Sequence, residues 1–135
     1  MGRNILAVAA AFVVGGICVF GLEWIGQQIY PLPEGVDPSN QQQLNDYLKQ
    51  APAGALLMVL LAQCAGSFVG GVVTGWLGCS RLFQLGLIYG CLALLMAALN
   101  VYFIPHPAWF VVLSLLLPIP LALLGNVVGQ ILGVR

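Results

Sequence analysis

The stretch AGALLMVLLAQCAGSFVGGVVTGWL, residues 53–77, decides the fold. It carries no charged residue over its whole length, and it exceeds the roughly 20 apolar residues that a helix needs to cross a hydrocarbon core of about 30 Å. Small residues recur at every fourth place within it, and this spacing puts them on one helix face. The stretch therefore predicts a membrane-spanning helix with one face of small residues.

Three further apolar stretches of similar length occupy residues 5–30, 82–104 and 108–134. The whole chain is 61% hydrophobic and 6% charged, with a mean hydropathy of +1.01, which is far from the composition of a soluble domain. Helices are expected rather than strands, because an open strand in lipid would leave peptide groups without hydrogen bonds. We expect an all-α integral membrane four-helix bundle that forms a single transmembrane domain over residues 1–135.

The basic residues predict the orientation of the four spans. Arg3, Arg81 and Arg135 fall at the amino end, in the second connection and at the carboxyl end, which lie on the same side of a four-span protein. Lys49 is the single basic residue of the first connection. By the positive-inside rule, both termini are expected in the cytoplasm and residues 31–52 outside, as in a bacterial inner-membrane protein.

The external segment, residues 31–52, has the pattern of a short amphipathic helix. Ser39 with Gln42 three places later has the form of a capping box at its start. Its apolar side chains share one face at helical spacing, namely those of Leu44, Tyr47 and Leu48. This helix is expected either to cover an outer cavity or to rest on the bilayer and the helix ends.

Small residues spaced by four occur in all four spans. Lipid gives helices no hydrophobic reason to associate, so close backbone approach at small residues supplies much of the packing energy. Whether these faces pair within one chain or between subunits is left open by the sequence. The residues expected to pack in this way are Gly66, Gly70, Gly86, Gly90, Gly125, Gly129 and Gly133.

Polar side chains gather at the predicted outer ends of the first and third spans. Glu23 lies 18 residues after Ile5, which places it roughly 27 Å into a core of about 30 Å. Gln27 and Tyr30 continue its helix face, and Asn100 lies at a similar depth on the third span. This layer is expected either to join helices by hydrogen bonds or to form a mouth that binds a cation, an amine or a proton.

A second polar feature is expected near the middle of the membrane. Gln63 lies at that depth on the second span, and Pro118 should break the fourth span there because it frees the backbone carbonyl of Ser114. The amide of Gln63 is then expected to cap the break. The alternative is a binding site beside an interrupted helix, as transporters build it. Nearer the cytoplasm, Asn126 and Gln130 are expected to bridge helices, with Thr74 at similar depth.

The residues that carry chemistry are few. His106 is the only histidine, no cysteine pair has the Cys-x-x-Cys spacing, and no motif for nucleophilic catalysis or phosphate binding is present. Cys18, Cys64 and Cys91 fall at one depth within the spans and are expected to behave as small buried apolar residues rather than as soft-metal ligands. Four basic residues cannot form a patch for nucleic acid. We expect no enzymatic activity, cofactor, metal or nucleic-acid partner.

The first half of the chain carries the pattern E-x-x-G-[HQ]-x-x-YP-x-P-x-G-x-D. Its positions are Glu23, Gly26, Gln27, Tyr30, Pro31, Pro33, Gly35 and Asp37. A glycine-rich second span follows it. In this pattern the chain resembles uncharacterised four-span bacterial membrane proteins. The resemblance implies placement in a membrane and brings no activity with it.

Two classes of function remain open at this point. The first is a small non-catalytic membrane protein that acts through helix packing, as an oligomer or an accessory subunit of a larger complex, or that binds a lipid-like molecule. The second is a transporter or channel for a small, mostly uncharged solute, with Glu23 at the outer mouth and Gln63 beside the broken helix. In both, the lipid bilayer is the first partner.

Overall fold

The computed structural model describes residues 1–133, and every regular element in this range is a helix. Four stretches are long and apolar enough to cross a membrane, which confirms the predicted four-span helical bundle. The predicted fourth span ended at residue 134, which lies outside the described residues. Arg135, which contributed to the predicted orientation, lies outside them as well. The helices in chain order are α1 (Gly2–Ile29), α2 (Gln41–Gln50), α3 (Ala53–Leu77), α4 (Leu82–Phe103), α5 (Ala108–Leu116) and α6 (Pro118–Leu132).

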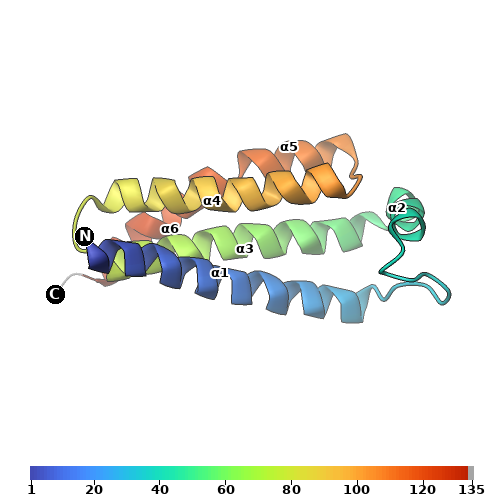
Figure 1. The fold of residues 1–135 in the computed structure, drawn as a ribbon, viewed down its shortest axis with the longest axis horizontal. Helices are drawn as coiled ribbons and strands as arrows, with labels where there is room; N and C mark the ends of the chain where they lie inside the picture. Colours follow the sequence, from blue (N-terminus) through green and yellow to red (C-terminus); the bar gives the residue numbers. More distant parts are fainter. Residues whose placement is uncertain (134–135) are drawn as a thin grey trace.

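Helix α3 lies at the centre of the bundle (Figure 1). It packs along α1 on one side and along α6 on the other, and α4 packs mainly on α6. Helices α1 and α4 touch each other over a short stretch only. Helix α2 lies across one end of the bundle, here named the α2 end, and α1 begins and α6 ends at the opposite end (Figure 1).

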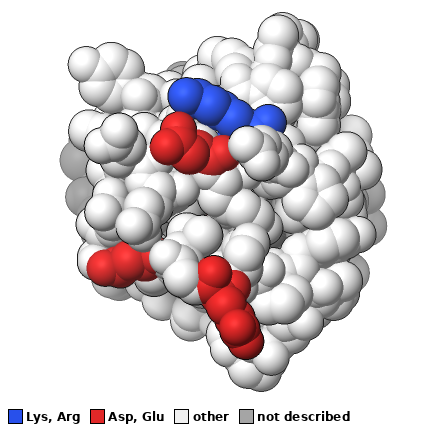
Figure 2. All heavy atoms as spheres, turned by 90° about the vertical axis from the view of Figure 1, so that its right-hand side faces the viewer, with Lys and Arg blue, Asp and Glu red and all other residues white. Residues whose placement is uncertain are grey.

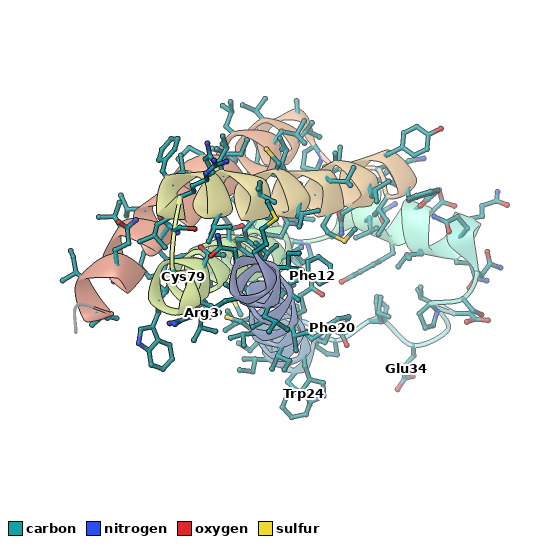
Figure 3. The ribbon with its side chains drawn as sticks, turned by 60° about the vertical axis from the view of Figure 1, so that its left-hand side comes forward. Arg3, Phe12, Phe20, Trp24, Glu34 and Cys79 are labelled. Atoms are coloured by element: carbon teal, nitrogen blue, oxygen red, sulfur yellow. The ribbon has the colours of Figure 1, made fainter. Side chains whose placement is uncertain are left out.

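The distribution of side chains is that of a protein immersed in lipid. Large apolar side chains face outward, and Phe20 and Trp24 are 75% and 64% exposed. In Figure 3 the Trp24 side chain projects away from the bundle. The interior instead holds small residues, such as Ala11 and Ala62, both fully buried. This arrangement agrees with close backbone packing as the main contact between membrane helices.

Glycines bring α3 and α6 into backbone contact. Gly125 and Gly129 of α6 face backbone atoms of Phe68, Val72 and Trp76 on α3, so a Cβ at either glycine would collide with them. The contact is mutual, because Gly71 of α3 faces the backbone of Ala122. The sequence spacing predicted one small face for the second span. The structure shows a second such face, formed by Gly71 and Gly75 and turned toward α6.

The remaining predicted glycine faces are also occupied within one chain. Gly66 faces α1, and Gly70 faces the ring of Tyr89 from α4. Gly86 and Gly90 face α6, and Gly133 lies against Trp76 of α3. Self-association would therefore have to use other surfaces.

The predicted polar bridge between spans is present near the end of the bundle opposite α2. Asn126 Nδ2 donates to Thr74 Oγ1 at 2.9 Å, and Gln130 Nε2 donates to Asn126 Oδ1 at 2.7 Å. Asn126 and Thr74 are 1% and 0% exposed, so the pair joins α6 to α3 in the interior. At the same end, Arg3 Nε donates to the carbonyl of Leu77 at 3.1 Å, which ties α1 to α3 (Figure 3).

Helix α2 begins one residue later than the predicted capping box requires. Its N-cap is Asn40, whose side chain accepts from the backbone amides of Gln42 and Gln43. The Ser39 hydroxyl instead donates to Asp37 Oδ1 at 2.6 Å, and this hydrogen bond lowers the pKa of the Asp37 carboxyl. The capping role predicted for Ser39 was wrong, because Asp37, two residues earlier, accepts the hydrogen bond from its hydroxyl.

The fourth span is interrupted at Leu117, as its prolines predict. Helix α5 ends at Leu116 and α6 begins at Pro118, and Leu117 between them keeps right-handed helical angles. Pro118 has no amide hydrogen, so one backbone hydrogen bond of the helix is missing, but the chain continues in the same direction. The fourth span therefore stays continuous across the membrane with a local break.

Candidate functional site

A cavity of about 350 Å³, here named the deep cavity, lies between α1, α3 and α4. Its wall on α1 runs from Phe12 to Glu23, and its wall on α4 runs from Tyr89 to Asn100. Each wall covers 12 residues of helix, and the 11 steps between its ends correspond to about 16 Å at about 1.5 Å per residue. Helices α1 and α4 contact each other only briefly, which leaves this space between them.

A second cavity of about 320 Å³, here named the α2-end cavity, lies under α2. Glu23 and Asn100 line both cavities. The apolar face of α2 forms its cover with Leu44, Tyr47 and Leu48. Gln41 Nε2 on α2 donates to the carbonyl of Phe103 at 3.1 Å, which ties α2 to α4. Helix α2 therefore covers a cavity, which is one of its two expected placements, and it also contacts the end of α4.

The structure brings most of the predicted polar residues together. Glu23, Gln63, Asn100 and Pro118 line the deep cavity. Gln27 and Tyr30 line the α2-end cavity, again with Glu23 and Asn100. Ser114 is 1% exposed and lies behind Gln63, outside both linings.

Glu23 is half-buried and has no cation beside it. The one ion pair among the described residues joins Lys49 and Asp46 at 3.6 Å on the surface of α2. No Lys or Arg lines the deep cavity or the α2-end cavity. Figure 2 shows the α2 end from outside, where a basic side chain lies next to an acidic one and other acidic side chains lie apart from them.

Asn100 presents a buried acceptor without a donor. Its Oδ1 atom is shielded from solvent and makes no hydrogen bond within the described part of the chain. Asn45 Oδ1 on α2 is likewise buried without a partner. Asn100 lines both cavities, and because its Oδ1 atom is shielded from solvent, the other atoms of its side chain are the ones that border them.

Gln63 contacts the break in the fourth span, but in a different way from the prediction. Ser114 Oγ donates to Gln63 Oε1 at 2.7 Å. Gln63 was predicted to donate to a freed backbone carbonyl, whereas its amide oxygen accepts from the serine hydroxyl. The small space between Gln63, Leu117 and Pro118 has no room for a water molecule. The break is therefore packed shut.

Tyr89 lines the deep cavity toward the end away from α2 and was not among the predicted site residues. Its hydroxyl donates to the carbonyl of Gly66 at 2.8 Å, and its ring lies against Gly15 and Gly70. The available signal was an aromatic residue between Gly86 and Gly90 on the same span. Its hydroxyl donor had to find an acceptor in the bundle, and the glycine faces left room for the ring.

His106 lies in the connection between α4 and α5, at the edge of the α2-end cavity. Its ring stacks on Phe110 with a centroid distance of 4.2 Å, and its Nδ1 is 2.7 Å from the carbonyl of Ile104. Burial lowers the pKa of His106, and the hydrogen bond to Ile104 opposes this shift. The imidazole is therefore mainly neutral near pH 7 and adds little positive charge to the cavity.

Residues 1–133 contain no group of three or more His, Cys, Asp or Glu side chains placed to hold a metal ion. Comparison of the chain with family models, curated proteins and solved structures gives no match. The resemblance to four-span bacterial membrane proteins stays a prediction, and the function has to be inferred from the site alone.

Proposed function

We propose that this protein is a non-catalytic membrane protein that binds a lipid-like amphipathic molecule in the deep cavity. The observation that carries the proposal is the shape and chemistry of this cavity. Its polar groups Glu23 and Asn100 lie toward the α2 end, and mainly apolar side chains line the rest. A volume of about 350 Å³ is within the range of roughly 300–1,000 Å³ that small-molecule sites occupy.

The rim of the deep cavity supports access from the lipid. Phe12, Phe20 and Met96 belong to its lining and are 46%, 75% and 48% exposed on the surface that faces lipid in a membrane. A molecule already dissolved in the bilayer can thus enter sideways between α1 and α4. Its chain would replace lipid contacts with protein contacts of similar polarity, while its polar end would meet Glu23 and Asn100.

The same residues support a role without catalysis. A lone carboxylate and an amide, with a tyrosine hydroxyl already bonded to a backbone carbonyl, do not supply a nucleophile, a base and an oxyanion donor together. Binding, storage or presentation of the molecule to a partner protein are roles that this set of groups can perform. Because the glycine faces are used within the chain, a partner or a second copy would contact the large apolar side chains of the outer surface.

The binding proposal is tested by filling the cavity. Gly16 lines the deep cavity and Gly21 does not, and a Cβ at either position meets nothing within 4 Å. In nanodiscs of phosphatidylcholine, we expect at least one of dodecanol, dodecanoate and dodecylamine to bind the wild type saturably. Gly16→Trp should abolish this binding and Gly21→Trp should preserve it. Absence of binding, or equal binding by the two variants, would refute the proposal.

A bacterial inner-membrane location with cytoplasmic termini is part of the same proposal. Arg3 and Arg81 support it, because both lie at the end of the bundle opposite α2. Cys79 is exposed at that end, whereas Cys18, Cys64 and Cys91 lie within spans. A membrane-impermeant maleimide should therefore label Cys79 in inside-out vesicles and leave it unlabelled in intact cells. The reverse result would show that the end of the bundle that carries Cys79 lies outside the cell, and would refute the proposed orientation.

A transporter for a small, mostly uncharged solute is the second candidate. It is supported by Glu23 and Asn100, which line both cavities and so join the α2 end to the middle of the bundle. The closed packing between Gln63 and Pro118 is the main observation against a path through the break. Reconstituted vesicles should show a solute flux that Glu23→Gln abolishes if this candidate is right. A flux equal to that of protein-free vesicles would exclude it.

A further inference from the structure

The groups at the junction of the two cavities restrict the chemistry of the bound molecule. We propose that the ligand is a single-chain amphiphile whose polar end is an ammonium group with N–H donors, seated between Glu23 and Asn100. This inference rests on the proposed function and adds to it the chemical class of the polar end and the direction in which the molecule lies.

The hydrogen-bonding groups at the α2 end of the deep cavity favour a ligand that donates. Glu23 lines both cavities, and its carboxylate offers acceptors only. Tyr89 and Gln63 of the same lining have partners within the chain: Tyr89 donates to Gly66, and Gln63 Oε1 accepts from Ser114. A ligand that donates hydrogen bonds to Glu23 meets the acceptors that this end offers. An ammonium group supplies up to three donors from one atom.

The ionisable groups of the linings favour a cation. Glu23 is the one acidic side chain that lines the deep cavity, and no Lys or Arg lines either cavity. His106, the nearest ionisable nitrogen in the α2-end lining, has a lowered pKa. A cation therefore gains an ion pair and charge-assisted hydrogen bonds with Glu23. A carboxylate or phosphate end would meet like charge without a compensating cation, so a fatty acid or a phosphate ester is disfavoured.

The last argument is the shape of the cavity beyond the polar end. From Glu23 and Asn100 the lining continues along Val19, Phe20 and Met96 toward Tyr89, over about 16 Å of helix. With the polar end at Glu23, the alkyl chain therefore points away from α2, toward Tyr89. The thioether of Met96 adapts to chains of different shape. The ammonium end stays under α2, where the α2-end cavity provides space for water.

The inference is tested with four probes that share a dodecyl chain and differ in the polar end. In phosphatidylcholine nanodiscs, with empty nanodiscs as the blank, dodecylamine should bind at least about tenfold more tightly than dodecanol. Dodecyltrimethylammonium has the charge without N–H donors and should fall between them. Dodecanoate should bind most weakly. Equal affinities for dodecylamine and dodecanol would overturn the inference.

Two variants locate the polar end. Glu23→Gln should weaken dodecylamine binding at least about tenfold and dodecanol binding much less, because glutamine keeps an acceptor for a hydroxyl but loses the charge that pairs with an ammonium group. Glu34→Gln makes the same charge change on an exposed residue outside both cavity linings and should leave both affinities unchanged. An equal effect of the two variants would mean that only the general charge of the α2 end matters, and would refute the assignment to Glu23.

The outcomes separate this inference from the function on which it rests. Binding of dodecanol or dodecanoate that Gly16→Trp abolishes, without a preference for the amine, would keep the cavity as a ligand site and remove the ammonium assignment. If none of the four probes binds, both proposals fall.

Discussion

The contact between α3 and α6 predicts a large difference between two substitutions that are chemically identical. In Gly129→Ala, the new methyl group would collide with Val72 and would lie 2.9 Å from the backbone nitrogen of Trp76. These are backbone atoms of α3, which cannot rotate away as a side chain can, so the two helices have to separate. Overpacking of this kind costs about 1–3 kcal/mol, and we expect the upper end.

The helix-forming preference of alanine offsets part of this cost. Replacement of glycine within a helix contributes about 1 kcal/mol of stabilisation, so Gly129→Ala should lower the free energy of unfolding by about 2 kcal/mol. That is a factor of about 30 in the ratio of folded to unfolded protein. Gly21→Ala is the matched control, because a Cβ at Gly21 meets nothing within 4 Å. It should leave stability unchanged or raise it by up to about 1 kcal/mol.

The measurement is reversible unfolding of the detergent-solubilised protein, titrated with sodium dodecyl sulfate and followed by circular dichroism. The two variants should differ by about 3 kcal/mol, the sum of the expected loss and the largest expected gain. Equal unfolding curves for Gly129→Ala and Gly21→Ala would refute the view that backbone contact between α3 and α6 holds the bundle together.

Three further predictions concern single interactions. Asn40→Ala removes the N-cap of α2 and should destabilise that helix by about 1 kcal/mol, which speeds hydrogen exchange in α2, whereas Ser39→Ala should leave its exchange unchanged. Thr74→Val breaks the buried hydrogen bond from Asn126 and should lower the free energy of unfolding by about 1 kcal/mol in the same detergent titration; no change would mean that Asn126 finds another partner. The pKa of His106 is lowered in the folded protein, so the folded state favours the neutral imidazole. The resulting stabilisation is complete above the ordinary histidine pKa of about 6.5. It is lost as the pH falls through the lowered pKa of the folded protein. Hydrogen exchange at the α4–α5 connection should accelerate on acidification in the wild type, and His106→Gln should remove this pH dependence; identical profiles would contradict it.

The parts of the fold that follow from local composition were predictable. Apolar length and turn residues located all four spans, and the bounds of α3 agree with the prediction at both ends. The missing amide hydrogen of Pro118 predicted the break, because this property belongs to the residue alone. The start of α2 was less predictable: Asp37, Ser39 and Asn40 compete for the same backbone groups, and only the folded geometry shows which of them caps the helix.

The site was predictable in its members and less so in its arrangement. Depth along each helix placed Glu23 and Asn100 at one level, and the structure brings both to the same two cavities. Depth alone does not give the rotation of one helix about another. For that reason the sequence left open whether α2 covers a cavity, and it missed Tyr89, whose ring lies against Gly15 and Gly70 of two other helices. The hydrogen bond from Ser114 to Gln63 likewise depends on a side-chain rotation that residue spacing does not fix.

The central position of α3 has a consequence for mechanics. Helix α1 is anchored along α3 and only briefly along α4, whereas α4 is fastened to both α3 and α6. A tilt of α1 about its seam with α3 would therefore widen or narrow the space toward α4 while the contact between α3 and α6 stays intact. We expect spin labels on the lipid-facing sides of α1 and α4 to show a broader distribution of distances than a pair of labels on α3 and α6. In that case α3, α4 and α6 would form a rigid unit, and α1 would move relative to it.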